Sequence, residues 1–347
     1  MNPSYLILKS GEVFQGYSPE KQNGLFFGEV VFNTSMVGYV EALTDPSYCN
    51  QILTFSYPLI GNYGVDNGRS WESAKIQVAG MVCSELSYDF SHHCAQISVQ
   101  QWLEDQNVPM MWGIDTRALV KCLRNKGVVA GVISSTRVSP KQFIDVNQED
   151  LVAKVSCTEV IETGIGDKKV VVVDCGIKQN ILRCLDQYPI RIKRVPYNYD
   201  YTSEDYDGLF ISNGPGDPSM CKETIATLKK AMNKDKPIFG ICLGAQLMSL
   251  AIGARTYKLP FGHRAQNHPC MDLRSRRCYL TSQNHGFAIE EKSLPKDWHV
   301  TFKNLNDNTV QGIAHIKKPF FSVQFHPEAA PGPFDTYWLF DKFYELL

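Results

Sequence analysis

The chain has 347 residues, a length that fits two domains better than one compact core. Its 35 lysines and arginines nearly balance 36 aspartates and glutamates, so no global basic field exists to attract nucleic acid or an anionic membrane. Hydrophobic residues make up 44% of the chain, which is ordinary for a globular protein. We therefore expect no nucleic-acid partner.

Three further features bear on the compartment. Residues 1–5 lack the charged region and the long apolar stretch of a secretion signal. The longest apolar run, residues 238–254, is interrupted by glycines and polar residues and is too short to span a membrane. The 11 cysteines include no Cys-x-x-Cys pair, which argues against a disulfide framework and a thiolate zinc site. These features predict a cytoplasmic protein without a membrane segment.

The first part of the chain shows short strands separated by frequent turn signals. Apolar runs at residues 5–8 and 30–32 are each followed by turn-forming residues. Helical patterns cover residues 99–104 and 116–125, and Gly127 is a typical stop signal after the second. These patterns predict a strand-rich, mixed α/β domain with no obvious chemistry of its own.

A change of pattern follows the polar, glycine-containing segment 159–169, which is the best candidate for a domain boundary. We predict one domain over residues 1–160 and a second over residues 168–347. In the second, the β-branched run 170–174 is typical of a strand covered on both faces. Helices are expected at 179–185 and 223–233, and further strands at 190–195, 208–212, 237–241, 278–282, 299–303, 311–316 and 321–325.

This alternation of strands and helices predicts a fold class. The second domain is expected to be α/β, with a doubly wound, mostly parallel sheet that gains antiparallel strands in its last third. Ligands of such sheets bind outside the carboxyl ends of the parallel strands. Residues that directly follow strands are therefore the first place to look for chemistry.

Cys242 lies in such a place, within the run Gly240-Ile241-Cys242-Leu243-Gly244. An apolar strand leads into this run and a helical pattern leads out, which is the arrangement of a nucleophile elbow with cysteine in place of serine. The helix N-terminus would also stabilise a thiolate. The alternative is a small thiol buried in the core. The elbow alone leaves these two interpretations about even.

A second feature is His326-Pro327-Glu328, at the end of an expected strand. An imidazole can hold the proton of a thiol, and a carboxylate can orient the imidazole and stabilise its charged form. Alone, the triplet is more typical of a strand end with a solvated glutamate. Together with the elbow it indicates a Cys242, His326 and Glu328 triad.

A third feature is the loop 213–218, Asn-Gly-Pro-Gly-Asp-Pro, directly after a strand. Acyl transfer needs N–H donors aimed at a developing oxyanion, and glycines leave backbone N–H groups accessible. We expect one donor from Gly216 and one from Leu243. Since glycine, proline and aspartate also form ordinary turns, this loop by itself does not decide between the two interpretations.

These motifs, in this order, resemble the class I, triad-type glutamine amidotransferases, and the likeness covers residues 169–347. Other segments resemble the small subunits of carbamoyl phosphate synthases, a family within that class, so that the likeness extends over nearly the whole chain. These segments are residues 32–39, 43–48, 113–117, 267–269 and 283–288.

The resemblance implies roles that spacing does not supply. Substrate L-glutamine would be bound by Ser47, Gly214, Gly216, Leu243, Gln246, Asn284, Gly286 and Phe287. From the residues alone, Ser47 is a polar turn residue, and residues 284–287 are a turn between strands. The sequence departs from the family pattern at Ala245, commonly a larger polar residue, and at residues 264–266, where small glycines are usual.

The resemblance also implies a partner and a reaction. Ammonia released from glutamine would pass to a large subunit, forming a heterodimer or an oligomer of heterodimers. That subunit would use bicarbonate and ATP with Mg to make carbamoyl phosphate for pyrimidine or arginine biosynthesis. This chain would need no cofactor, in line with its lack of a Gly-x-x-x-x-Gly-Lys-[Ser/Thr] loop.

Three alternatives remain at this point: another amidotransferase, for anthranilate or GMP synthesis; a cysteine hydrolase of peptides or γ-glutamyl compounds; and a scaffold that only activates the large subunit. No metal site is expected. His92-His93-Cys94 is interpreted as a surface loop or strand end, because adjacent side chains rarely face one ion and structural sites need four ligands. His263 and His268 are interpreted as parts of a polar turn.

Overall fold

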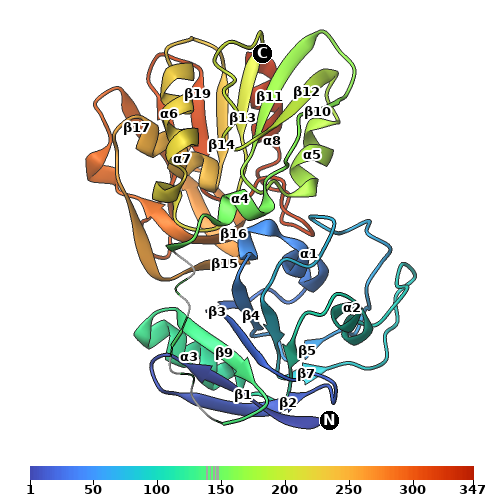
Figure 1. Ribbon diagram of the computed structural model, residues 1–347. Coiled ribbons are helices and arrows are strands. Elements are labelled where there is room, and N and C mark those ends of the chain that lie inside the picture. Colours follow the sequence, from blue (N-terminus) through green and yellow to red (C-terminus); the bar gives the residue numbers. More distant parts are fainter. Residues whose placement is uncertain (138–139, 141, 144, 146–147) are drawn as a thin grey trace. The chain divides into compact units, whose positions relative to one another are not determined.

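A computed structural model of the protein describes residues 1–137, 140, 142–143, 145 and 148–347. Its backbone contacts divide the chain into two compact units, Met1–Glu149 and Asp150–Leu347 (Figure 1). The segment after Asp150 belongs to the second unit, because Val152 lies in that unit's core and Tyr197 Oη donates a hydrogen bond to Asp150 Oδ2 (3.1 Å). The sequence-domain limits at 160 and 168 stay predictions.

The first unit is built on a mixed seven-stranded sheet in the order β2-β1-β9-β3-β4-β6-β8. Strands β3, β4, β6 and β8 run parallel, whereas β1, β2 and β9 pair antiparallel. The strands of this unit are β1 (Asn2–Leu8), β2 (Val13–Ser18), β3 (Leu25–Asn33), β4 (Gln51–Phe55), β5 (Leu59–Ile60), β6 (Gly80–Val82), β7 (Glu85–Leu86), β8 (Met110–Met111) and β9 (Val129–Ser134). Its helices are α1 (Tyr39–Thr44), η1 (Pro46–Tyr48), α2 (Val99–Asp105) and α3 (Thr116–Lys126).

The second unit is built on a ten-stranded sheet in the order β10-β12-β11-β13-β14-β19-β18-β17-β15-β16. Strands β12, β11, β13, β14 and β19 are parallel, and the rest pair antiparallel. The strands are β10 (Ile161–Thr163), β11 (Lys168–Asp174), β12 (Ile190–Pro196), β13 (Gly208–Ile211), β14 (Ile238–Ile241), β15 (Thr256–Asp272), β16 (Cys278–Ile289), β17 (Trp298–Asn304), β18 (Val310–His315) and β19 (Phe320–Val323).

Helices cover both faces of this sheet, as Figure 1 shows. Successive residues of β11 point to opposite faces: Val171 packs in one core cluster with residues of α6 and α7, and Val172 packs in the other with residues of α5 and α8. The helices are α4 (Leu151–Val155), α5 (Gln179–Leu185), η3 (Pro218–Met220), α6 (Lys222–Ala231), α7 (Leu243–Ala251), η4 (Glu291–Ser293) and α8 (Trp338–Leu346). The predicted doubly wound α/β fold is confirmed, with the parallel strands β12, β11, β13, β14 and β19 flanked by antiparallel strands on both sides.

Two local predictions are wrong. His263 and His268 belong to the long strand β15 instead of a polar turn, and His263 is buried. Residues 284–287 lie inside β16 instead of forming a turn between strands. In both segments polar and small residues face a protein interior that is itself polar, so the hydrophobic alternation that marks a strand is absent from the sequence. None of the helices in the described part of the chain has the length and apolar character needed to cross a membrane.

Candidate active site

The turn between β14 and α7 holds Cys242 in a strained backbone conformation. Its φ of 54° and ψ of −105° lie outside the regions that residues with a side chain ordinarily occupy. Cys242 N–H donates to Val323 O (2.8 Å), which ties the turn to β19. The side chain is buried, and Sγ donates to Asn284 O on β16 at 3.6 Å. Strain at the carboxyl end of a parallel strand is typical of a nucleophile elbow.

Two glycines allow the elbow to pack this closely. A Cβ on Gly244 would lie 2.2 Å from Ile211 O, and a Cβ on Gly240 would lie 2.9 Å from Gly244 O. Real Cβ atoms do not approach backbone atoms so closely, because interiors are already close-packed. The two glycines of the motif therefore serve the packing of α7 against β13 and β14.

Substitution of alanine for Gly244 is expected to lower the free energy of unfolding by about 1–3 kcal/mol through overpacking. The sign is informative, because Gly→Ala in an unhindered helix raises stability by up to about 1 kcal/mol. Chemical denaturation measures the difference. Gly286→Ala is the matched control, since its Cβ would meet only Arg264 Nη2, at an ordinary 3.5 Å. An unchanged or raised stability of Gly244→Ala would contradict this account of the packing.

His326 and Glu328 follow β19 and lie side by side. Nδ1–H of His326 donates to Glu328 Oε1 at 2.6 Å, and each residue is 1% exposed. The His326 backbone N–H donates to Ser282 O on β16 (2.9 Å), which places the ring near the strand that also contacts Cys242. The pair of imidazole and carboxylate that the motif predicted is thus formed. Because the pair is buried, solvent does not compete for its hydrogen bond.

Two contacts to Glu328 were missed by sequence reasoning. Lys178 Nζ lies 3.1 Å from Glu328 Oε1, and both side chains are almost fully buried. Asn180 Nδ2 donates to Glu328 O at 2.6 Å. Both residues stand at the start of α5, about 150 positions before Glu328 in the chain. The available signal, a lysine just before a helix, is too common to have identified them.

These buried charges determine which groups carry protons. Burial opposes the charged form of His326, but the Glu328 carboxylate and the Cys242 sulfur outweigh it and raise the pKa of the ring. Burial likewise opposes the Glu328 carboxylate, whereas His326 and Lys178 lower the pKa of that group. At neutral pH the ring is therefore protonated and Glu328 is ionised. Nε2 of His326 is buried and makes no hydrogen bond of ordinary geometry within the described residues, although Cys242 lies close enough to raise the pKa of the ring.

The loop after β13 is tied to the loop after β11. Asn213 Oδ1 accepts from the N–H of Lys178 (3.0 Å). A Cβ on Gly214 would lie 2.0 Å from Cys175 O, so only glycine fits there. Gly216 has a φ of +86°, in the left-handed region that favours glycine. Glycine is thus required at position 214 by the lack of space for a side chain and favoured at position 216 by its backbone conformation. A simple surface turn would need neither.

The predicted oxyanion donors lie on two neighbouring segments. Leu243 is the first residue of α7, so its N–H has no acceptor within the helix. The Leu243 side chain lies against Gly214, 2.7 Å from the position of an added Cβ, so the helix N-terminus borders the loop that carries Gly216. The assignment of the Gly216 and Leu243 N–H groups as donors remains a prediction.

Five residues predicted to bind glutamine lie on α7 and β16: Leu243, Gln246, Asn284, Gly286 and Phe287. Gln246 Nε2 donates to Phe287 O (3.0 Å) and to Gln324 Oε1 (3.1 Å), which uses both amide hydrogens and leaves Oε1 as an acceptor. The Asn284 carbonyl accepts from Cys242, and Gly286 lies between Asn284 and Phe287 on the same strand. The fold thus brings α7 and residues 284–287 together. Their contact with glutamine stays a prediction.

Ser47 belongs to the first unit, whereas the other predicted site residues all belong to the second. It is buried within η1, and its N–H donates to Asp45 Oδ1 (2.8 Å). This local bond explains the turn that Pro46 suggested. The contact of Ser47 with glutamine stays a prediction from the resemblance.

The two departures from the family pattern lie at buried positions. Ala245 is fully buried within α7 and packs in the core cluster on that face of the sheet. Arg264 is buried on β15, where Nη1 donates to Phe261 O (2.7 Å). Neither residue takes part in the bonds that join Cys242, His326 and Glu328 to their neighbours.

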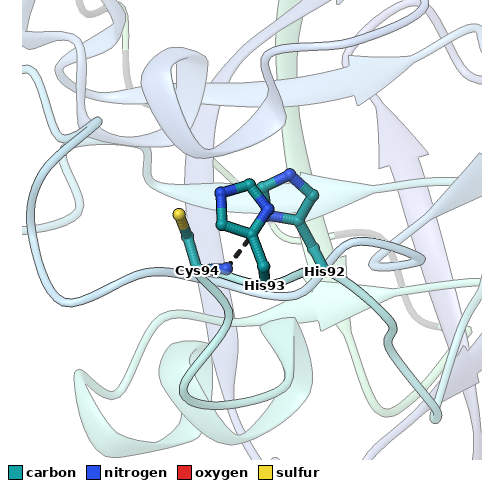
Figure 2. Close-up of side chains that lie close together, drawn as sticks. All are labelled: His92, His93 and Cys94. Carbon is teal, nitrogen blue, oxygen red and sulfur yellow. Dashed lines mark hydrogen bonds between the residues drawn. The ribbon is translucent and has the colours of Figure 1, made fainter.

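Within the described residues, His92, His93 and Cys94 are the group that could hold a metal ion. Their ligand atoms all lie within 4.8 Å of one another, and Figure 2 shows the three side chains on the same side of a loop. The expectation that these adjacent side chains would diverge is therefore not met. They supply three ligands, one fewer than a structural zinc site uses, and both histidines are exposed.

Comparisons with known proteins match both halves of the chain. The family model for "Glutamine amidotransferase class-I" matches residues 171–346. The family model for "Carbamoyl-phosphate synthase small chain, CPSase domain" matches residues 6–133. The second match covers the part of the chain in which composition and patterning had indicated no chemistry.

Relatives of two kinds match nearly the whole chain. The arginine-specific small chain of carbamoyl phosphate synthase from Saccharomyces cerevisiae is 44% identical, over 97% of this chain and 87% of that protein. Multifunctional protein CAD from Squalus acanthias is 50% identical, over 92% of this chain and 15% of that protein. Multifunctional protein pyr1-3 from Dictyostelium discoideum is 46% identical, over 97% and 16% respectively. The chain thus spans about a sixth of the length of these multifunctional relatives.

Proposed function

The chain belongs to the family of carbamoyl phosphate synthase small chains, and from this membership we propose that it is the glutamine-hydrolysing chain of such a synthase. The observation that supports the proposal most directly is the arrangement around Cys242. Cys242 is strained and buried, and both Cys242 and His326 hydrogen-bond to backbone carbonyls of β16. The buried Glu328 carboxylate orients the protonated His326 ring. These are the parts that thiol-based acyl transfer requires.

In the proposed first half-reaction, the proton of the Cys242 thiol, which otherwise points at Asn284 O, resides on His326 Nε2, and the resulting thiolate attacks the carboxamide carbon of glutamine. The C–N bond breaks, a γ-glutamyl thioester forms, and His326 donates its Nε2 proton to the departing ammonia. The N–H groups of Gly216 and Leu243 stabilise the oxyanion of the tetrahedral intermediate. Glu328 holds the ring by its Nδ1–H, so that Nε2 faces the reacting atoms.

In the second half-reaction His326, now neutral, removes a proton from water, which attacks the thioester carbon. The C–S bond breaks, glutamate leaves, and the proton remains on His326 beside the regenerated thiolate. Lys178 keeps Glu328 ionised throughout, because a cation 3.1 Å from its carboxylate favours the charged form. The charged pair of thiolate and imidazolium is thus restored at the end of each cycle.

The released ammonia is proposed to pass to a large subunit that consumes ATP with Mg and bicarbonate. The small-chain relative from Saccharomyces cerevisiae supports a separate partner, since its name describes one chain of a synthase. The product, carbamoyl phosphate, would serve arginine or pyrimidine synthesis. Within this chain the proposed chemistry uses only protein groups.

The test measures glutamate release by the purified chain, alone and with a carbamoyl phosphate synthase large subunit, and measures carbamoyl phosphate formation in the mixture. We expect slow hydrolysis alone, faster hydrolysis with the partner, and carbamoyl phosphate from glutamine only in the mixture. A free-ammonia arm reports whether the large subunit is active. A further arm replaces glutamine with peptides and γ-glutamyl compounds. Each alternative function gives a different pattern across these arms.

Glutamine hydrolysis that never supports carbamoyl phosphate formation would indicate an amidotransferase of another pathway. Faster turnover of peptides than of glutamine would indicate a hydrolase. Stimulation of ammonia-dependent synthesis without any glutamine hydrolysis would indicate a scaffold. Any of these three results would contradict the proposed function.

A further inference from the structure

The pairing of β15 with β16 is interrupted beside the proposed site. His263 pairs with His285, but the next pair is Lys258 with Phe287, so residues 259–262 stand opposite Gly286 alone. A break of this kind removes the regular ladder of backbone hydrogen bonds. Gly286 therefore has no regular partner in the ladder, and the short segment from His285 to Phe287 of the proposed glutamine site depends more on side-chain contacts.

Side chains supply these contacts. The Phe287 carbonyl accepts from His285 Nδ1–H at 2.7 Å and from Gln246 Nε2 at 3.0 Å. Gln246 Nε2 also donates to Gln324 Oε1. Because the Phe287 carbonyl is one of the two acceptors of this NH₂ group, its position helps to fix which end of the Gln246 amide faces the site. With both Nε2 hydrogens engaged, Gln246 presents Oε1, an acceptor for an N–H group of the substrate.

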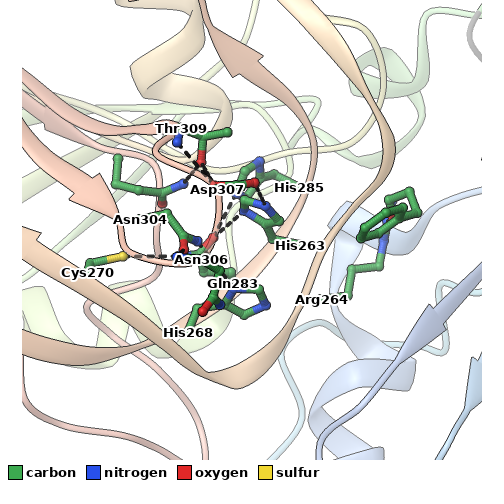
Figure 3. Close-up of polar contacts among 12 residues, drawn as sticks. His263, Arg264, His268, Cys270, Gln283, His285, Asn304, Asn306, Asp307 and Thr309 are labelled. Carbon is green, nitrogen blue, oxygen red and sulfur yellow. Dashed lines mark hydrogen bonds and ion pairs between the residues drawn. The ribbon is translucent and has the colours of Figure 1, made fainter. Parts of the chain in front are cut away.

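A buried chain of polar side chains continues behind His285, and Figure 3 shows it. Gln283 Oε1 lies 2.9 Å from His285 Nε2 and 3.0 Å from His263 Nδ1. A neutral His285 that donates from Nδ1 can only accept at Nε2, so the amide bonds to both rings with its NH₂ end turned toward them, since the two ends of an amide occupy interchangeable positions. His263 Nε2 lies 2.7 Å from Asp307 Oδ2. The chain thus leads from Phe287, through two histidines and a glutamine, to a carboxylate in the turn between β17 and β18.

Burial restricts the side chains of this hydrogen-bonded network. Gln283 is 2% exposed and His263 6%, whereas the Asp307 side chain is 39% exposed. Burial lowers the pKa of His285, so that ring is neutral, and its Nδ1–H toward Phe287 O fixes its tautomer. A buried polar group that loses its partner is costly, so a change at one end is transmitted to the next member. Asp307 is itself held by Thr309, whose N–H and Oγ1 donate to Oδ1.

We propose that Asp307 and His263 are positioning residues for glutamine, acting through Gln283 and His285 on the Phe287 carbonyl and hence on Gln246. This inference rests on the proposed function. Neither residue touches the groups that make or break bonds, so binding of glutamine depends on them more than the chemical step does. A purely structural network would instead affect stability and leave the kinetic constants unchanged.

The first test is Asp307→Asn, which keeps an acceptor oxygen for Thr309 and replaces the acceptor for His263 with an NH₂ group. Loss of a hydrogen bond to a charged group predicts a KM for glutamine raised roughly tenfold. The kcat is expected to stay within about twofold, and alkylation of Cys242 by iodoacetamide to keep its wild-type rate, because the triad is untouched. Glu291→Gln, which removes an exposed carboxylate paired with Lys303, is the matched control and should change neither constant.

The second test asks whether Asp307 acts through His263. The double variant Asp307→Asn/His263→Asn should have the same KM as His263→Asn alone, because the effects of substitutions within one hydrogen-bonded network are not additive. If His263→Asn does not fold, the KM of Asp307→Asn alone still tests the inference, because the Asp307 side chain is half-exposed. An unchanged KM in Asp307→Asn, with wild type hydrolysing glutamine, would overturn this inference and leave the proposed function standing. No hydrolysis by wild type, with or without the large subunit, would overturn both.

Discussion

Replacement of Cys242 with serine is expected to lower glutamine hydrolysis by at least about 10³-fold, because members of a catalytic unit are not individually dispensable. The reason lies in the state of His326. Its pKa is raised by Glu328 and Cys242, so at neutral pH the ring is already protonated and suits a thiolate neighbour. A serine hydroxyl does not ionise beside it, and a protonated ring cannot take the hydroxyl proton.

Steady-state glutamate release, measured with the large subunit present, checks this result. Cys278→Ser is the matched control, since Cys278 is an exposed thiol on β16 outside the site. Ammonia-dependent carbamoyl phosphate synthesis should be the same for both variants, which shows that the partner still binds and works. Wild-type glutaminase activity in Cys242→Ser would remove the basis of the proposed mechanism.

Replacement of Glu328 with glutamine is expected to lower the free energy of unfolding by about 3–5 kcal/mol near neutral pH, the typical cost of breaking a buried ion pair. The variant leaves Lys178 and His326, both buried, without their shared anion. Glutamine hydrolysis should fall as well, because the ring loses the acceptor that orients its Nδ1–H.

The pH dependence of this loss has a definite sign. The pKa of Glu328 is lowered from 4.5 to about 2, so its contribution to stability is complete above pH 4.5 and disappears toward pH 2. The pKa of His326 is raised from 6.5 to about 10, so its contribution is complete below pH 6.5 and disappears toward pH 10. The stability difference between wild type and Glu328→Gln is therefore expected to be largest between pH 4.5 and 6.5.

Denaturant unfolding of wild type and Glu328→Gln from pH 3 to pH 9 measures the difference. Glu345→Gln, at an exposed position near the end of α8, controls for the loss of one carboxylate and should track wild type at every pH. A difference that is constant from pH 3 to pH 9 would mean that the loss comes from packing and has no contribution from the ion pair.

Local patterns allowed much of the second unit to be predicted. The helix expected at 179–185 is α5 with the same limits, and the run 170–174 lies within the parallel strand β11. The elbow at Cys242 could be predicted because an apolar strand, two glycines and a helix are adjacent in the chain. Each of these signals spans a few residues, which is the range over which backbone propensity and periodicity act.

Other parts of the site could not be predicted from local patterns. Strand β15 carries a buried histidine and a buried arginine, so its polar residues give the pattern of a turn, and residues 284–287 of β16 do the same. Lys178 could not be connected with Glu328, because nothing in the 150 intervening positions marks their meeting. The roles of Ser47 and of the N-terminal domain came from family resemblance and from no physical signal.

Residue types and local turn signals in the sequence indicate a kind of chemistry, because a thiol in an elbow, an imidazole and a carboxylate are identifiable without the fold. Which of these groups meet, and which protons they hold, follows only from the tertiary structure. Cys242 reaches Asn284 O and His326 N–H reaches Ser282 O only because β14, β16 and β19 belong to one sheet. Proton positions follow from burial and neighbouring charge, as at His326 between Glu328 and Cys242, and these are properties of the folded interior.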